Sequence, residues 1–446
     1  MTDSSVDIIV RLPSALSCEI LSAWLDAPDL VRTDSAYCNH ENRPQLHALY
    51  KQPGLICSNR SSSEYIDWFI ERKIRLRDFN AYKELKTGVA VGYLQEFGRT
   101  IESISLSAVT NLHLIEAVRA NCANVCNLKM DHKAGEPLTL LNTFKSLHSL
   151  NIYFAWNCGG TELSTDDLNE VQHLQKLRFT WEWAETENAI GLVKKCPRLT
   201  HFAPRCYSYE DIPDVSMIAM FSRLPHLSAL DLSGLSIDDA RLTAIVKHCP
   251  CIIHLSLLDS YTITDAAMYT VATTLKLKTI AIPSDFNLTD RTLEHLHHCR
   301  GTLEALHITH WSSSSFRPIK LTLPAVQTLI RSAHNSCRYT WSACVSREED
   351  LSKCANATSL RVSTKFTDAL LTKIAHTCIH LEKLNIHFPA KNVTSAGVYA
   401  VINNCPRLKT IHISRSVDKT RIVDVLNSHS KLFTFSVLPW YDVMEM

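Results

Sequence analysis

The sequence predicts an α/β solenoid, in which stacked strand–helix units share one parallel sheet. Short apolar segments recur about every 25 residues. An amphipathic helical pattern follows many of them, and cysteines return at one position of the repeat. A single unit of this size cannot bury its own apolar face, so neighbouring units must stack. The chain has 446 residues, of which 46% are hydrophobic and 20% charged, enough for a large core.

The strand half of each unit has the pattern L-x-x-L-x-L, with other apolar residues at some positions. Leu230 and Leu232 alternate with polar neighbours, which is typical of a short strand with one buried face. Because the side chains between them point the other way, each strand offers its remaining residues to the open face of the sheet. The first apolar positions of the units are Ile101, Val125, Leu147, Leu174, Leu199, Leu227, Ile252, Leu277, Leu303, Ala357, Leu381, Leu408 and Leu432.

One interval in this series is close to two periods long. It separates Leu303 from Ala357 and predicts a degenerate unit within residues 321–346. The apolar and aromatic run Tyr339–Val345 is the candidate strand of that unit. With this unit included, the series contains about fourteen repeats.

The helical half of each unit begins at residues that can cap a helix. In the unit that starts at Leu227, Ser236–Asp239 supply side-chain oxygens for the first backbone amides. Three further units begin their helices with a Thr-Asp pair at the same place. The buried stripe of the first helix is Leu242, Ile245, Val246 and Cys249. The Thr-Asp pairs are Thr264-Asp265, Thr289-Asp290 and Thr367-Asp368.

Half of the 16 cysteines fall at one position of the repeat, where a helix ends before the next strand. A position shared by every turn of a solenoid forms a row along it. A thiol there acts as a small apolar group with a weak donor. We therefore expect buried structural thiols and a reducing compartment instead of disulfides or metal ligands. These cysteines are Cys122, Cys196, Cys249, Cys299, Cys337, Cys354, Cys378 and Cys405.

The segments ITDAAMYTVA, FTDALLTKIAHTCIHLEKLNI and AGVYAVINNCPRLKTIHI resemble the cysteine-containing leucine-rich repeat. The resemblance covers residues 100–440, although the second cysteine that the family places after the strand is mostly absent. It implies a right-handed horseshoe with the parallel sheet on its concave side. Such repeats are most familiar in F-box proteins.

Residues 8–52 do not follow the period and predict a separate helical segment, and residues 53–99 predict a linker and a cap for the first repeat. The run LPSALSCEILSAWL has a helical apolar stripe that Pro13 opens near its first turn. A turn at Pro28-Asp29 leads to a second short helix, and a third is expected from Arg43 to Tyr50.

This segment resembles an F-box, because Leu12, Pro13, Leu16, Ile20, Leu21, Leu25 and Leu30 fill the apolar positions of that family's first helices. The family continues with a valine–cysteine pair and a tryptophan, where this chain has Ala36-Tyr37-Cys38-Asn39. The resemblance implies that those seven residues bind a Skp-type adaptor, which connects to a cullin. The chain would then be the substrate-recognition subunit of a Skp–cullin–F-box ubiquitin ligase that directs substrates to proteasomal degradation. The alternative is a leucine-rich-repeat interaction or inhibitor protein without a ubiquitin role, in which the helices serve only as a cap.

No motif for nucleotide binding, hydrolysis or zinc binding occurs, so we expect no enzyme, no cofactor and no metal. The cluster His295, His297, His298 and Cys299 fits a repeat helix better, with histidines on solvent faces. A net charge of +1 provides no bulk field for nucleic acid or an anionic membrane. The N-terminus lacks a leader pattern, and no apolar run is long enough to span a membrane. We therefore expect a cytoplasmic or nuclear protein.

Function is then expected on exposed surfaces, and the partner on the open face is expected to be a protein substrate. The open-face residues of the strands include Lys129, Asn151, Arg178, Asp231, His307, Arg361, Asn385 and His412. Aromatic residues follow three consecutive strands, and such residues dominate many binding interfaces. The alternative for them is packing over the longer loops of irregular repeats. The candidate substrate-binding residues are Tyr153, Phe154, Trp156, Arg178, Trp181, Trp183, Tyr207 and Tyr209.

Overall fold

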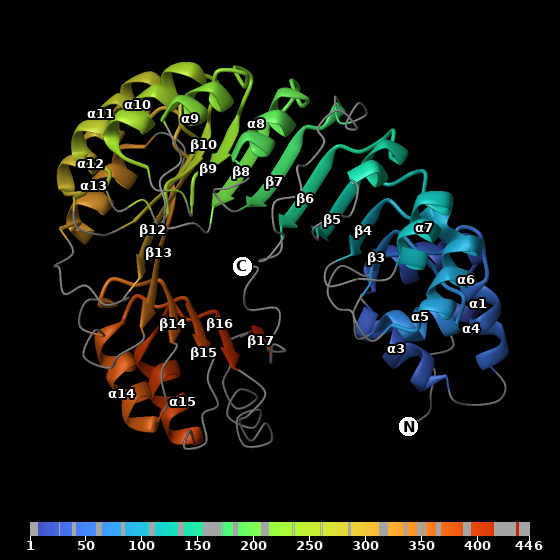
Figure 1. The fold of residues 1–446 in the computed structure, drawn as a ribbon. Coiled ribbons are helices and arrows are strands. Elements are labelled where there is room, and N and C mark those ends of the chain that lie inside the picture. The colour runs from blue at the N-terminus through green and yellow to red at the C-terminus, as the bar shows by residue number, and fades with distance from the viewer. Residues whose placement is uncertain are drawn as a thin grey trace. The chain divides into compact units, whose positions relative to one another are not determined.

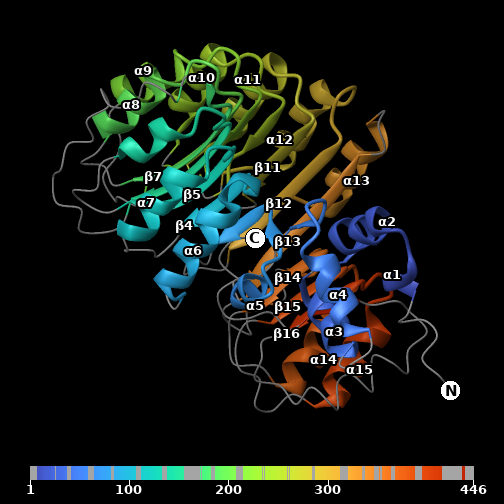
Figure 2. The ribbon, with the colours of Figure 1, turned by 90° about the vertical axis from the view of Figure 1, so that its right-hand side faces the viewer.

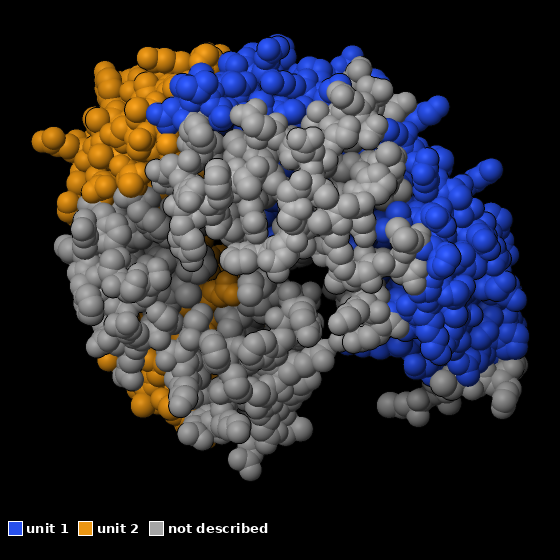
Figure 3. Space-filling view, in the orientation of Figure 1, with its two compact units in different colours: residues 1–226 blue, residues 227–446 orange. Residues whose placement is uncertain are grey.

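The computed structural model divides into two compact units, residues 1–226 and residues 227–446, coloured separately in Figure 3. These are called the first and the second unit below. The structure describes residues 8–25, 27–37, 42–58, 65–81, 85–106, 112–132, 138–154, 171, 173–181, 186–206, 214–233, 235, 237–258, 260, 262–283, 287–311, 320–333, 337–345, 351, 354–362, 367–386, 394–413 and 434–436.

The first unit begins with short helices. The expected continuous first helix is interrupted, because α2 ends at Glu19 and the next turn is π-helical. Pro13 occupies the N-cap position of α2, where its missing N–H costs nothing. The elements are α1 (Ile8–Arg11), α2 (Ser14–Glu19), η1 (Ile20–Trp24), α3 (Ala27–Ala36), α4 (Arg43–Tyr50), β1 (Ile56–Cys57), α5 (Ile66–Glu71) and β2 (Arg75–Leu76). Strands β1 and β2 pair in parallel.

The repeats of the first unit follow, with parallel strands hydrogen-bonded in chain order from β3 to β8 (Figure 1). Their strands are β3 (Asp78–Asn80), β4 (Ser103–Leu106), β5 (Asn127–His132), β6 (Ser149–Phe154), β7 (Lys176–Trp181) and β8 (His201–Cys206). Their helices are α6 (Thr87–Phe97), η3 (Gly98–Thr100), α7 (Leu112–Asn121), η4 (Leu138–Thr143), α8 (Thr186–Lys194) and α9 (Asp214–Phe221).

The parallel sheet starts earlier than the sequence indicated. Strand β3 pairs with β4 through Phe79 and Ile104, so one repeat precedes residue 100, where the first repeat was expected. Its pattern is Leu76-x-x-Phe79-x-Ala81, and all three residues are buried. The small Ala81 in the last apolar position concealed this copy in the sequence. The expected limits of the N-terminal segments remain a prediction.

The second unit continues the same plan, with β9 to β17 hydrogen-bonded in chain order and parallel pairing from β9 to β17. Its strands are β9 (Ala229–Asp231), β10 (His254–Ser256), β11 (Thr279–Pro283), β12 (Ala305–Trp311), β13 (Arg338–Val345), β14 (Ser359–Val362), β15 (Lys383–Ile386), β16 (Thr410–Ile413) and β17 (Thr434–Ser436). Its helices are α10 (Asp239–His248), α11 (Asp265–Thr274), α12 (Asp290–Leu296), η8 (His297–Cys299), α13 (Leu323–Ser332), α14 (Asp368–Thr377) and α15 (Ser395–Asn404).

These units confirm the predicted leucine-rich-repeat solenoid. A parallel strand follows each predicted first apolar position, and the degenerate repeat supplies β13 as expected. Leu227, Leu230 and Leu232 are all at most 2% exposed, as the alternation predicts. Helices of successive repeats lie side by side, as α10 and α11 do in Figures 1 and 2.

Strand β13 changes the alignment of the repeats. On one side Trp341 pairs with Ile308 of β12, in the normal apolar position. On the other side it is Ala343 that pairs with Leu360 of β14. Cys344 pairs with Trp311 of β12 on one side and with Arg361 of β14 on the other. As a result, the apolar pattern of β14 is displaced by four residues along the strand direction relative to the pattern of β12. The repeats after this offset have a core of their own, which includes Ala343, Leu360, Leu384 and Ile411.

The Thr-Asp pairs form contacts between repeats as well as helix caps. Thr264, Thr289 and Thr367 accept a hydrogen bond from a backbone amide of their own helices, as predicted, and within the predicted capping range Ser236–Asp239 it is Asp238 that caps α10. The aspartate after each threonine accepts bonds from the threonine of the next helix. Asp265, for example, accepts from the backbone N and Oγ1 of Thr289, at 2.9 and 2.6 Å.

The shared cysteine position is buried in every repeat predicted to have it. Where the thiol is well placed, it donates to a carbonyl of the preceding repeat. Cys378 Sγ lies 3.3 Å from the oxygen of Cys354, and Cys405 Sγ lies 3.4 Å from that of Cys378. The thiols thus align as a row, which confirms their predicted place in the fold.

Candidate functional site

The predicted adaptor-binding residues divide into two groups in the structure. Leu21 and Leu30 are at most 1% exposed and belong to the core of the N-terminal helices. Leu16 is 44% exposed and Pro13 is exposed, while Leu12, Ile20 and Leu25 are half-buried. A partner can therefore reach five of these seven side chains.

The division follows from the interrupted helix. Helix α2 is stopped after Glu19, and the π-helical turn of η1 follows it. The structure places Leu21 inside, while Leu16, on the preceding α-helical turn, faces out. An apolar side chain that stays in water gains the free energy of burial only when something covers it.

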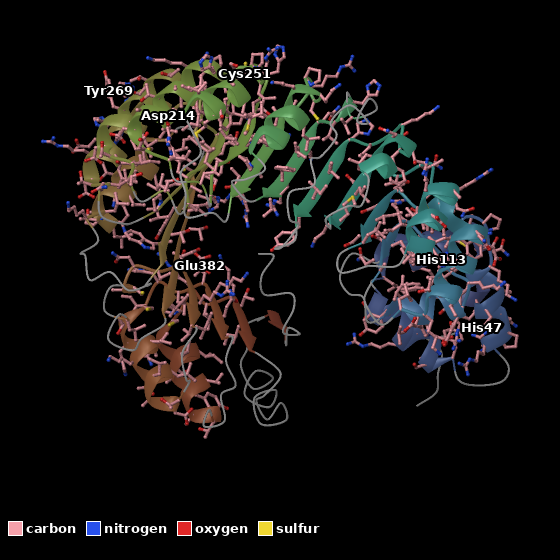
Figure 4. All side chains as sticks on the ribbon, in the orientation of Figure 1. His47, His113, Asp214, Cys251, Tyr269 and Glu382 are labelled. Carbon is pink, nitrogen blue, oxygen red and sulfur yellow. The ribbon has the colours of Figure 1, made fainter. Side chains whose placement is uncertain are left out.

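A buried carboxylate holds the N-terminal helices together. Asp34 of α3 is 3% exposed and lies 3.0 Å from Nη2 of Arg72, next to α5. Nε2 of His47 in α4 is 3.2 Å away, and Trp68 Nε1 is 3.4 Å away. Figure 4 labels His47 among these helices. Three helical segments therefore meet at one acidic group.

The surrounding side chains stabilise the ionised form of Asp34. Burial alone would raise the pKa of its carboxyl group, but the hydrogen bond and charge of Arg72 lower it, as do the hydrogen bonds of His47 and Trp68. The pKa is therefore below its ordinary value. The ionised Asp34 holds α3, α4 and α5 together. The sequence carried one signal for this group, since Asp34 lies on the same helical stripe as Leu30 and Tyr37.

The open face of the first unit is formed by rows of residues that pair across strands. One row is Ser105, Lys129, Asn151, Arg178 and Ala203. The row on the N-terminal side of the strands is Ser103, Asn127, Ser149, Lys176 and His201. Lys129, Asn151 and Arg178 are thus brought together, as the strand pattern predicted.

Basic residues gather where β7 and β8 meet. Lys176 and Arg178 are both exposed, and their strand neighbours include His201 and, one row further, Arg205. Sequence reasoning singled out Arg178 and missed the other three, although they occupy the same alternating positions. The open-face positions of β6, β7 and β8 hold no acidic residue.

The aromatic candidates are only partly within the described residues. Tyr153 lies in β6, paired with Asp131 and Thr180, and is half-buried. Phe154 and Trp181 are the last residues of their strands, and their side chains are not among those described. The other candidates, Trp156, Trp183, Tyr207 and Tyr209, lie outside the described residues. A common aromatic surface therefore remains a prediction.

The open face of the second unit has two separate parts. Asp231 pairs with Ser256, and further along the same row His307 pairs with Thr340. Arg361, Asn385 and His412 form the corresponding row after the offset at β13. Burial and the nearby charge of Arg338 lower the pKa of His307, so this ring is neutral near pH 7.

The titratable groups of the described residues show no arrangement typical of catalysis. No group of three His, Cys, Asp or Glu residues there could hold a metal ion. In the cluster noted above, His295 packs against Tyr269 at 5.1 Å between ring centroids, and His297 Nδ1 lies 3.1 Å from Ser332 Oγ. Burial raises the pKa of Cys122 and of Cys249 to about 12, which makes these thiols poor nucleophiles.

Within the part of the chain that the structure describes, no helix has the length and apolar character that would be needed to cross a membrane.

Comparisons with known proteins give similar folds only. No protein-family model matches the sequence, and no curated protein matches it. A chain of the yeast Rad7–Elc1 complex is 13% identical over 95% of this chain and 91% of its own length, with a TM-score of 0.42. The leucine-rich-repeat protein LegL7 from Legionella pneumophila is 10% identical over 74% of this chain and 98% of its own, with a TM-score of 0.35. A chain of the TLR13–ssRNA13 complex is 14% identical over 81% of this chain and 50% of its own, with a TM-score of 0.31.

Proposed function

We propose that this chain recognises protein substrates for a Skp–cullin–F-box ubiquitin ligase. The N-terminal helices bind a Skp-type adaptor, the adaptor connects to a cullin, and the repeats hold the substrate for degradation. Ubiquitin transfer belongs to other subunits, so the chain needs no catalytic residue and no cofactor. We further propose that it acts in the cytoplasm or nucleus, where such a ligase works.

The observation that carries this proposal is the accessible apolar run formed by Leu16 of α2 and the residues that flank this helix. Leu16 and Pro13 are exposed next to the half-buried Leu12, Ile20 and Leu25. These are the positions at which the sequence resembles an F-box. Covering a leucine of this kind contributes about 1.5–3 kcal/mol when burial is complete. An adaptor surface would supply that cover.

Capture of a Skp-type adaptor by the purified full-length chain tests the proposal. Leu12→Ala/Pro13→Ala and, separately, Leu16→Arg should each abolish capture. All three residues are accessible, so the thermal unfolding midpoint should hardly change. Val89→Arg on α6 is the matched control, since Val89 is 46% exposed and lies outside the N-terminal helices. Absence of capture by the unaltered chain, or equal loss in the Val89 variant, would exclude the ligase role.

A second function is favoured by the burial of Leu21 and Leu30. These two residues form core contacts, and the Asp34 cluster ties the same helices to α5. Both facts suit a cap for the solenoid in a leucine-rich-repeat interaction or inhibitor protein with no ubiquitin role. Deletion of residues 1–52 would then unfold the first repeats, and the unaltered chain would capture no adaptor.

A further inference from the structure

We infer that the open face of β5 to β8 binds a segment of a protein partner that is rich in aspartate and glutamate. This inference adds the chemistry of the substrate to the function proposed above. It rests on that function only for what happens to the protein after it has bound. The binding itself can be measured on the purified chain alone.

The open-face positions of β6, β7 and β8 carry cations and no carboxylate, while β5 adds Lys129 together with Asp131, which pairs with Tyr153. Lys176 and Arg178 lie two residues apart on β7, so both side chains stand on the open face. Both are exposed, and among the described residues no acidic side chain forms an ion pair with either of them. His201 and Arg205 add donors on β8, and Lys129 adds one on β5.

The remaining residues of the face suit a polypeptide. Ser149 and Asn151 on β6 are short and polar, and Tyr153 extends from the same strand. Such residues form hydrogen bonds to a peptide backbone while the basic residues select its carboxylates. Lys129 and Arg178 are two strands apart, about 10 Å. Alternate side chains of an extended chain lie about 6.7 Å apart on one face, and the long Lys129 and Arg178 side chains can lean inward to meet two such carboxylates.

A nucleic acid fits this face less well. The chain carries a net charge of +1, and these cations form a local group with no continuous basic track. Nucleic-acid affinity depends on neutralising many successive phosphates. A segment with a few carboxylates is matched by the exposed Lys176 and Arg178, with Lys129, His201 and Arg205 on the neighbouring strands.

Fluorescence anisotropy of the full-length chain with a fluorescein-labelled peptide of alternating glutamate and serine tests the inference. A peptide with glutamine at each glutamate position is the control ligand. We expect measurable binding of the glutamate peptide only, which weakens when salt rises from about 50 to 300 mM. Lys176→Glu/Arg178→Glu should weaken it at least about tenfold. The matched control is Arg198→Glu/Arg223→Glu, which makes the same change of net charge at exposed turns of the same unit and should stay within about twofold.

Three outcomes would overturn the inference. They are equal binding of the glutamine peptide, equal loss in the two charge-reversed variants, and tighter binding of a single-stranded oligouridine that displaces the peptide. If the charge-reversed strand does not fold, Lys176→Gln/Arg178→Gln provides the same test with a smaller loss. Adaptor capture by the same preparation separates the two hypotheses. A chain that captures the adaptor but ignores the peptide refutes only this inference, and the reverse result refutes only the ligase role.

Discussion

The two units stabilise the same strand–helix repeat with different polar contacts. In the second unit, aspartates at the start of the helices accept bonds from the next repeat, as Asp239, Asp265 and Asp368 do. In the first unit α6 begins after Lys86, which makes no capping bond, and a single buried group, Asp34, joins the N-terminal helices. Among the described residues, the second unit repeats one aspartate contact along the array, whereas the N-terminal helices of the first unit meet at one buried carboxylate.

Among the variants that test this comparison, replacement of Asp34 should lower stability most. Asp34→Ala leaves Arg72, whose side chain is 26% exposed, without its carboxylate, and the loss should be about 3 kcal/mol, the lower end for a buried pair. Hydrogen exchange measured by mass spectrometry should show faster exchange throughout residues 27–76. Asp29→Ala is the control, because the Asp29–Arg32 pair is exposed and should contribute less than about 1 kcal/mol. Similar exchange in both variants would show that the first unit does not depend on this cluster.

Replacing a single aspartate of the second unit should have a smaller and more local effect. Asp265→Ala removes the acceptor for Thr289 N, Thr289 Oγ1 and Thr292 Oγ1. We expect a loss of about 2–3 kcal/mol, detected as faster exchange in α11 and α12 while β15 and β16 remain protected. Glu294→Ala on the exposed side of α12 should change stability by less than about 0.5 kcal/mol. Faster exchange across the whole unit would contradict a distributed set of contacts.

Substitution of a cysteine in the buried row should lower stability less than either aspartate substitution. Cys378→Ser places a more polar hydroxyl in a fully buried position and should cost about 1–2 kcal/mol. Cys251→Ser, at an exposed thiol in the turn after α10, should be neutral. Urea unfolding followed by circular dichroism compares the two variants. Equal midpoints would mean that the buried row contributes no more than an exposed thiol.

Acid should affect both units in the same direction. The pKa values of Asp34 and Asp265 are lowered by folding: in each, burial alone would raise the pKa, but hydrogen bonds outweigh it. Their stabilisation is therefore complete above the pKa of the unfolded carboxyl, about 4, and is lost as the pH falls through the lower folded values. Unfolding midpoints measured from pH 7 to about 3 should fall, and less so in Asp34→Asn and Asp265→Asn. An unchanged slope in these variants would assign the acid sensitivity to other carboxyl groups.

The regular part of the fold could be predicted from sequence because it depends on local patterns. Strands such as β9 and β14 follow from alternating apolar residues, and β13 follows from a missing period. Strand β3 lies in the segment 53–99 that was predicted as a linker and cap, and it was not counted as a repeat because Ala81 weakens the pattern. The interruption between α2 and η1 was not predicted, because it depends on tertiary packing.

The candidate site was less predictable for the same reason. Alternation within one strand correctly placed Lys129 and Arg178 on the open face. It could not show that Leu21 turns inward while Leu16 stays exposed. The Asp34 cluster draws on residues up to 38 positions apart, which no local pattern connects.

The offset at β13 determines how far a single ligand can follow the second unit. Four residues of extended chain correspond to about 13 Å along the strands. A straight ligand segment that contacts Ser256 and His307 therefore continues to Thr340 and misses Arg361 by about 13 Å. The two stretches of sheet act as separate docking platforms, and one partner can engage both only if it bends between them or brings two epitopes.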